Sequence, residues 1–167
     1  MLRYLQGTKN LGLQFKACND FQRVIGYTDA NFSAKRSQTG AAIKFGANVI
    51  TWRSMKQSEV SPSSAESEVQ ALASTAVLAE YVRTIRESLC IPTPTIELRC
   101  DIIAAIVLAT GEGSWKPKSA ANKVYMVKEK VDRGLVTVTY VSTQDQCADS
   151  LTKFLRSGQG QKKAIAH

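Results

Sequence analysis

Two strand-like segments, each ending on an aspartate, lie on either side of the longest helical pattern in the sequence. Residues 24–29 are rich in β-branched and aromatic types and end on Asp29. Residues 96–101 alternate apolar with charged side chains and end on Asp101. Between them, apolar residues recur three or four positions apart over residues 69–89, as they do along the buried face of a helix. This arrangement predicts a sheet packed against a long helix, with acidic side chains at strand ends.

The neighbouring patterns define the start of the sheet and of the helix. Residues 41–45 and 49–53 bracket the turn-forming segment 46–48, so the first three strands form an antiparallel meander. Ser63 is the predicted N-cap of the helix, and Glu66 completes a capping box. The apolar positions expected to face the core are Val69, Leu72, Ala76, Ala79, Val82, Ile85 and Leu89.

Four further elements complete the predicted order. We expect a short helix over residues 102–108, a helix over 120–133 that stops at Gly134, a strand over 135–140 and a final helix over 145–154. The sequence therefore predicts an α/β fold, a mixed sheet with helices, in one domain covering residues 1–167.

Length and composition exclude several classes of protein. A chain of 167 residues that is 44% hydrophobic can build one sizeable core. It contains neither an apolar run of membrane-spanning length nor a signal-peptide pattern, which predicts an intracellular protein, cytoplasmic or nuclear, without a membrane partner. The 4 cysteines form no CxxC pair, so their spacing indicates neither a zinc site nor a disulfide framework. The single histidine is the last residue, His167, which argues against Ser-His and Cys-His catalysis.

The charge of the chain favours a polyanionic partner. Its formal net charge is +8, and basic side chains placed near phosphates release counterions on binding. Trp115 lies among lysines, a combination that can stack on bases and follow a phosphate backbone; a solvated loop with the indole folded onto the core is the alternative. The candidate nucleic-acid-binding residues are Arg36, Trp115, Lys116, Lys118 and Lys123.

The acidic residues suggest the chemistry. Asp29 and Asp101 end strands, Glu68 lies in the first turns of the long helix, and Asp149 lies on the last helix. Carboxylates gathered at neighbouring element ends can hold hard divalent cations such as Mg²⁺. A two-metal site of this kind suits phosphodiester hydrolysis and needs no histidine. The alternative is that these acids are ordinary solvated surface groups.

Several sequence blocks, in order, resemble the ribonuclease H portion of copia-type retrotransposon polyproteins, over about nine-tenths of the chain. The blocks cover residues 2–8, 26–32, 37–40, 50–57, 63–68, 101, 128–131, 140–149 and 151–153. The resemblance implies a ribonuclease H-like fold, with a five-stranded mixed sheet flanked by helices. It also implies cleavage of the RNA strand of an RNA/DNA hybrid during reverse transcription.

By position, the resemblance implies that four acids are the catalytic metal ligands: Asp29, Glu68, Asp101 and Asp149. They would hold two ions, Mg²⁺ or Mn²⁺. Glu66 precedes Glu68 by two residues, about 200° of helix rotation, and its capping role accounts for it without chemistry. Residues 1–20 would connect to an upstream reverse transcriptase domain, which is the implied protein partner, and residues 155–167 would form a flexible tail.

Three departures from the family pattern support a different function. Ile102, Ile103, Ala104 and Ala105 stand where relatives carry Asn-Gln-Ser-Ala, which removes two amides beside the predicted metal site. A Lys-His-Ile-Asp motif is missing near residues 118–125, and the loop over 33–37 is short. The alternative function is a weakened or inactive ribonuclease H-like module that binds nucleic acid or a protein.

Overall fold

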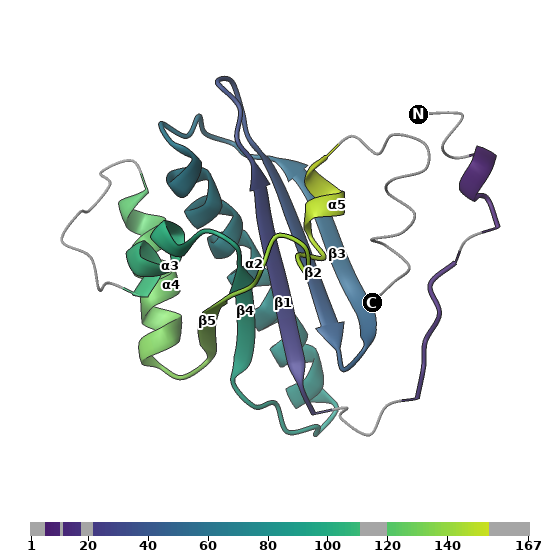
Figure 1. Cartoon of the computed structure of the whole chain (residues 1–167). Coiled ribbons are helices and arrows are strands. Elements are labelled where there is room, and N and C mark those ends of the chain that lie inside the picture. Colours follow the sequence, from purple (N-terminus) through teal and green to yellow (C-terminus); the bar gives the residue numbers. More distant parts are fainter. Residues whose placement is uncertain (1–5, 11, 18–21, 111–119, 154–167) are drawn as a thin grey trace.

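The computed structural model describes residues 6–10, 12–17, 22–110 and 120–153 and contains a five-stranded mixed sheet (Figure 1). The strand order is β3-β2-β1-β4-β5. The strands are β1 (Val24–Asn31), β2 (Gln38–Phe45), β3 (Asn48–Lys56), β4 (Ile96–Cys100) and β5 (Val136–Tyr140). The fold class predicted from the sequence is confirmed.

The first three strands form the predicted antiparallel meander, and the other two run parallel to β1. Gly46, with φ of +56°, occupies the tight turn between β2 and β3, a backbone conformation that glycine adopts without strain. In the parallel pair, Tyr27 of β1 lies opposite Arg99 of β4. Because parallel strands end at the same edge of a sheet, Asp29 and Asp101 emerge at the same level.

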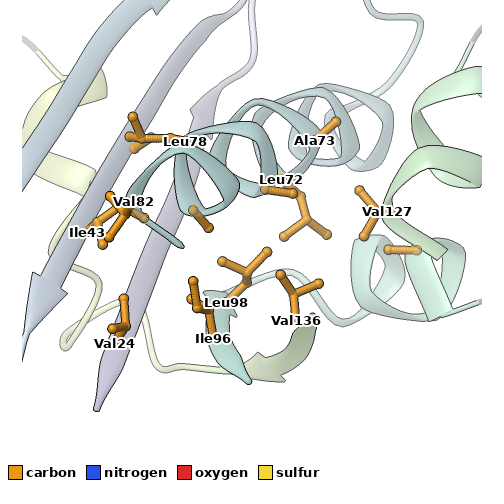
Figure 2. Close-up of a cluster of buried hydrophobic side chains, with 14 residues drawn as sticks. Val24, Ile43, Leu72, Ala73, Leu78, Val82, Ile96, Leu98, Val127 and Val136 are labelled. Carbon is orange, nitrogen blue, oxygen red and sulfur yellow. The ribbon is translucent and has the colours of Figure 1, made fainter. Parts of the chain in front are cut away.

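Helix α2 (Ser64–Ser88) covers one face of the sheet and forms the main core with it (Figure 2). Val24 and Ile43 contribute from β1 and β2, and Leu98 contributes from β4. Leu72 and Val82 face them from the helix. Ser63 is the N-cap as predicted, since its Oγ accepts a hydrogen bond from the backbone N–H of Glu66 at 3.2 Å.

The predicted apolar stripe of α2 is correct as far as Val82 and wrong beyond it. Ile85 and Leu89 are 43% and 64% exposed, whereas Arg86 is buried. The Arg86 guanidinium lies 4.5 Å from the centre of the Phe45 ring and donates hydrogen bonds to Thr93 Oγ1 and Pro92 O. In this last part of the helix the buried side chain is therefore Arg86, and not the neighbouring Ile85 that periodicity predicted.

Two helices lie beside α2 and β5. They are α3 (Ile103–Thr110) and α4 (Ala121–Asp132), close to their predicted bounds. Ala105 and Leu108 of α3 pack with Ala120 and Val124 in a second apolar cluster. Gly134, with φ of +67°, follows α4 where the helix was predicted to stop.

The opposite face of the sheet carries α5 (Asp149–Thr152), which is shorter than the helix predicted over residues 145–154. Asp145 lies in a turn, and Gln146 lies in an irregular segment between two turns. The buried Gln146 amide donates to Thr28 O at 2.9 Å and accepts from Ala148 N at 3.2 Å. These bonds fix a turn ahead of the helix, and the predicted end at Phe154 lies outside the described residues.

The ends of the chain are described only in part. Residues 6–8 form a single helical turn, while the whole predicted tail over residues 155–167 and parts of the segment over residues 1–20 lie outside the described ranges. Within the described ranges, no helix is both long enough and apolar enough to cross a membrane.

Candidate active site

The two aspartates that were predicted to end strands meet near the carboxyl edge of the central strands, although β1 continues past Asp29 to Asn31. Asp29 is the sixth residue of β1, is 6% exposed and accepts a hydrogen bond at Oδ2 from Thr152 Oγ1 on α5. Asp101 directly follows the last residue of β4. Its Oδ2 accepts a hydrogen bond from Thr143 Oγ1 at 3.0 Å. Each carboxylate is thus oriented by a threonine from the C-terminal part of the chain.

Glu68 reaches this edge from the first turns of α2. Its side chain is 2% exposed, and its Oε1 accepts a hydrogen bond from the backbone N–H of Ala30, the residue after Asp29, at 2.9 Å. The Cys100 thiol lies 3.9 Å from the other oxygen, Oε2. Glu68 therefore connects the ends of β1 and β4.

Asp149 is the first residue of α5 and is 6% exposed. Its Oδ1 forms an ion pair with Lys153 Nζ, four residues further on. Asp149 and Asp101 both act electrostatically on Asp29. The structure thus brings the four predicted carboxylates into one acidic cluster.

Burial and the neighbouring negative charges disfavour the charged forms of Glu68 and Asp29. Burial, followed by the charge of Asp29, raises the pKa of Glu68 to about 8, although the bond from Ala30 opposes the shift. Burial also raises the pKa of Asp29, and Asp101 and Asp149 add to that increase against the hydrogen bond from Thr152. A cation bound among these groups would relieve both the burial and the repulsion.

One oxygen atom in the cluster suits a metal ligand. Asp101 Oδ1 is buried and has no hydrogen-bond partner among the described residues. Because buried carboxylate oxygens are normally paired, this atom has room for a bond that a cation could make. Single ligand atoms of Asp101, Glu68 and Cys100 all lie within 4.8 Å of one another. The donor set therefore fits a divalent cation.

Two of the five predicted nucleic-acid-binding residues, Arg36 and Lys123, lie in the described part of the chain. Arg36 is exposed in the loop between β1 and β2. Lys123 lies on α4, where its Nζ pairs with Glu59 Oε2 at 3.1 Å. The other three, Trp115, Lys116 and Lys118, lie outside the described residues.

Four residues of the site were missed in the sequence: Cys100, Thr143, Thr152 and Lys153. Thr152 and Lys153 follow Asp149 by three and four positions, the spacing of one helix face, so helical periodicity could have identified them. Thr143 carries no such local signal. Its contact with Asp101 depends on the pairing of β4 with β5, since Cys100 lies opposite Tyr140.

The fold is that of ribonuclease H. The structure superimposes on that of LC11 RNase H1, which was isolated from compost by a metagenomic approach and solved in complex with an RNA/DNA hybrid. The TM-score is 0.62 and the sequence identity is 16%. The match covers 77% of this chain and 93% of that one. The N-terminal RNase H domain of a Mycobacterium tuberculosis protein gives a TM-score of 0.63 at 11% identity, covering 78% of this chain and 90% of that one.

Retrotransposon polyproteins are among the relatives that match most of the chain. The chain is 32% identical over 159 residues to the retrovirus-related Pol polyprotein from transposon RE1 of Arabidopsis thaliana, and 31% identical over 160 residues to that from transposon RE2. Each match covers 92% of this chain but only 11% of the polyprotein. No protein-family model matches the sequence. The chain is therefore homologous to one segment of copia-type, retrovirus-related Pol polyproteins, as its sequence blocks predicted.

Proposed function

We propose that the chain is a divalent-metal-dependent endoribonuclease that cleaves the RNA strand of RNA/DNA hybrids during retrotransposon reverse transcription. The observation that carries the proposal is the acidic cluster, in which β1, α2, β4 and α5 each supply or adjoin one carboxylate. The buried, unpaired Oδ1 of Asp101, noted above among the described residues, supports a cation ligand there.

Asp29, Glu68, Asp101 and Asp149 would hold Mg²⁺ or Mn²⁺, because hard divalent cations prefer carboxylate oxygens. Two such ions, when bound, supply an activated water and stabilise the leaving oxygen of a phosphodiester. The protein's own contribution is to orient the carboxylates: Thr152 fixes Asp29, the Ala30 amide fixes Glu68 and Thr143 fixes Asp101. This preorganisation reduces the side-chain motion needed when cations and substrate bind.

The proposed substrate is supported by charge and by structural similarity. The net charge of +8 favours a polyanion, and the similar LC11 enzyme was solved in complex with an RNA/DNA hybrid. Discrimination of RNA from DNA would depend partly on the 2′-hydroxyl. The reverse transcriptase domain is the proposed partner, within a longer intracellular polyprotein, since the RE1 and RE2 relatives are Pol polyproteins of which this chain spans 11%.

A binding module without cleavage is the second candidate function. The observation that favours it is the apolar character of the segment after Asp101: Ile103 is 64% exposed and Ile102 packs against the second apolar cluster. Amides at these positions could contact substrate or support metal ligands, whereas isoleucine offers neither kind of hydrogen bond.

Cleavage of strand-labelled hybrids distinguishes the two functions. Purified protein is incubated with a hybrid labelled on either strand, in Mg²⁺, in Mn²⁺ or with a chelator, and hybrid binding is measured in parallel. The enzyme proposal expects metal-dependent cuts within the RNA strand and an intact DNA strand. Preserved binding by folded protein without cleavage would contradict it and support the module.

A further inference from the structure

The sulfur of Cys100 is a potential metal-ligand atom beside two of the proposed catalytic carboxylates. It is the last residue of β4, its side chain is fully buried, and its Sγ lies 3.9 Å from Glu68 Oε2. Sγ and one carboxylate oxygen each of Glu68 and Asp101 lie within 4.8 Å of one another. Three side chains from α2 and the end of β4 thus present one sulfur and two oxygens to the same small volume.

The proposed nuclease function leaves this thiol without a role. Mg²⁺ and Mn²⁺ prefer oxygen ligands, so they have little use for sulfur. The thiol packs among Val69, Ala105 and Leu108, and a small apolar side chain would fill such a place without adding a sulfur donor. The mixed sulfur and oxygen set instead matches the ligands that borderline-soft ions accept.

We propose that Glu68, Cys100 and Asp101 form a binding site for a thiophilic divalent ion of the Zn²⁺ class, and that occupation of this site inhibits the nuclease. The inhibitory part rests on the proposed function, because the site takes Glu68 and Asp101 away from the catalytic ions. Zinc and the two hard ions are therefore mutually exclusive.

The binding step exchanges one ion for the protons that its ligands carry. Zn²⁺ forms a bond to Cys100 Sγ as the S–H bond breaks, the proton on the Glu68 carboxyl leaves in the same way, and both protons pass to solvent. Carboxylate oxygens of Glu68 and Asp101 provide two further bonds, and water takes the fourth position of a tetrahedral ion. Asp101 Oδ1, the buried atom that lacks a hydrogen-bond partner in the described part of the chain, is available for one of them.

Cadmium absorption tests the site without any nuclease assay. The full chain is titrated with Cd²⁺ alone, and the ultraviolet thiolate-to-cadmium charge-transfer band is followed. We expect the band to saturate at one equivalent, to disappear in Cys100→Ser and Cys100→Ala, and to persist in Cys90→Ser and Cys147→Ser, which remove the other two free thiols of the described residues. A band that survives both Cys100 substitutions, or no band in the wild type, overturns the site.

Zinc inhibition of hybrid cleavage tests the proposed inhibitory role of the site. Each variant is compared with its own zinc-free rate in Mg²⁺, so that any change in basal rate cancels. The zinc concentration for half-inhibition should rise at least about tenfold in Cys100→Ser, as expected when a metal ligand is lost, and stay unchanged in Cys90→Ser. Equal inhibition of both variants overturns the inhibitory role. A Cys100-dependent cadmium band in a protein that never cleaves supports the ion site and contradicts the nuclease proposal.

Discussion

At the scale of single residues, Glu66 and Glu68 show how two neighbouring acids acquire different roles. Both are buried in the first turns of α2. The backbone N–H of Glu66 is held by the Ser63 cap, whereas the side chain of Glu68 accepts a hydrogen bond from Ala30 and lies among the other acids. About 200° of helix rotation separates the two side chains.

Replacing each glutamate by glutamine should therefore give different results. Glu68→Gln removes a proposed metal ligand, so its rate of hybrid cleavage should fall at least about 100-fold, beyond the usual effect of losing an outer-shell group. Glu66→Gln keeps the backbone cap and should cleave close to the wild-type rate. Single-turnover cleavage by the folded variants measures both, and equal losses would contradict the assignment of Glu68.

Glu97 gives a prediction about stability and pH. Burial acts to raise its pKa, but hydrogen bonds from Arg99, Arg23 and Thr139 outweigh burial and lower the pKa to about 2. A carboxyl whose folded pKa lies below its ordinary value stabilises the fold above that ordinary value, and this stabilisation is lost as pH falls toward the folded pKa. The free energy of unfolding should thus fall more steeply from about pH 5 to pH 2 in the wild type than in Glu97→Gln. Glu129→Gln, which changes an exposed carboxylate on α4, is the control; identical pH profiles for wild type and Glu97→Gln would refute the prediction.

At the scale of elements, the position of α5 depends on a glycine in β2. A β-carbon on Gly40 would lie 2.7 Å from Ala148 O and 2.8 Å from Thr152 Cγ2. Helix α5 carries Asp149, a proposed metal ligand, and Thr152, whose hydroxyl orients Asp29. The close approach of α5 to Gly40 therefore fixes the positions of both side chains.

Gly40→Ala should displace α5 and affect stability and cleavage together. We expect the free energy of unfolding to fall by about 1–3 kcal/mol, as for an overpacked core. The cleavage rate should fall as well. The matched control is Gly12→Ala, since a β-carbon there meets nothing within 4 Å. Denaturant unfolding and hybrid cleavage measure the two effects, and a variant with unchanged stability would show that α5 does not require the glycine.

Elements with local signals were predicted well, and elements fixed by distant contacts were not. The strand over residues 24–29, the Ser63 cap and the stop at Gly134 depend on nearby residues, and the structure has all three. The late start of α5 depends on the bond from Gln146 to Thr28, 118 positions away, which periodicity does not reveal. For the same reason the four acids could be chosen by resemblance, but Thr143, the hydrogen-bond partner of Asp101, could not.

At the scale of the whole molecule, the chain has a ribonuclease H fold and a net charge of +8. It aligns with one segment of a much longer polyprotein. Binding of a hybrid by such a chain should depend strongly on salt, because basic side chains replace counterions along the phosphates. The affinity should fall at least about 100-fold between 50 and 200 mM salt, as for roughly four or more phosphate contacts. Arg36→Ala should make the slope of log affinity against log salt concentration shallower, by the amount expected for about one lost phosphate contact. Fluorescence anisotropy at several salt concentrations measures this, and a flat dependence would rule out a binding mode dominated by phosphate contacts.

The central claim is that carboxylates from separate parts of the chain form one metal-dependent hydrolytic site. Its most direct test is the rate of RNA-strand cleavage in Mg²⁺ by the wild type, Asp29→Asn, Asp101→Asn and the control Asp132→Asn, which changes an exposed acid at the end of α4. We predict cleavage by the wild type and the control, and rates at least about 100-fold lower in the other two, since each loses a metal ligand. Cleavage that persists in Asp29→Asn and Asp101→Asn, or a folded wild type that cleaves no hybrid, would contradict the claim.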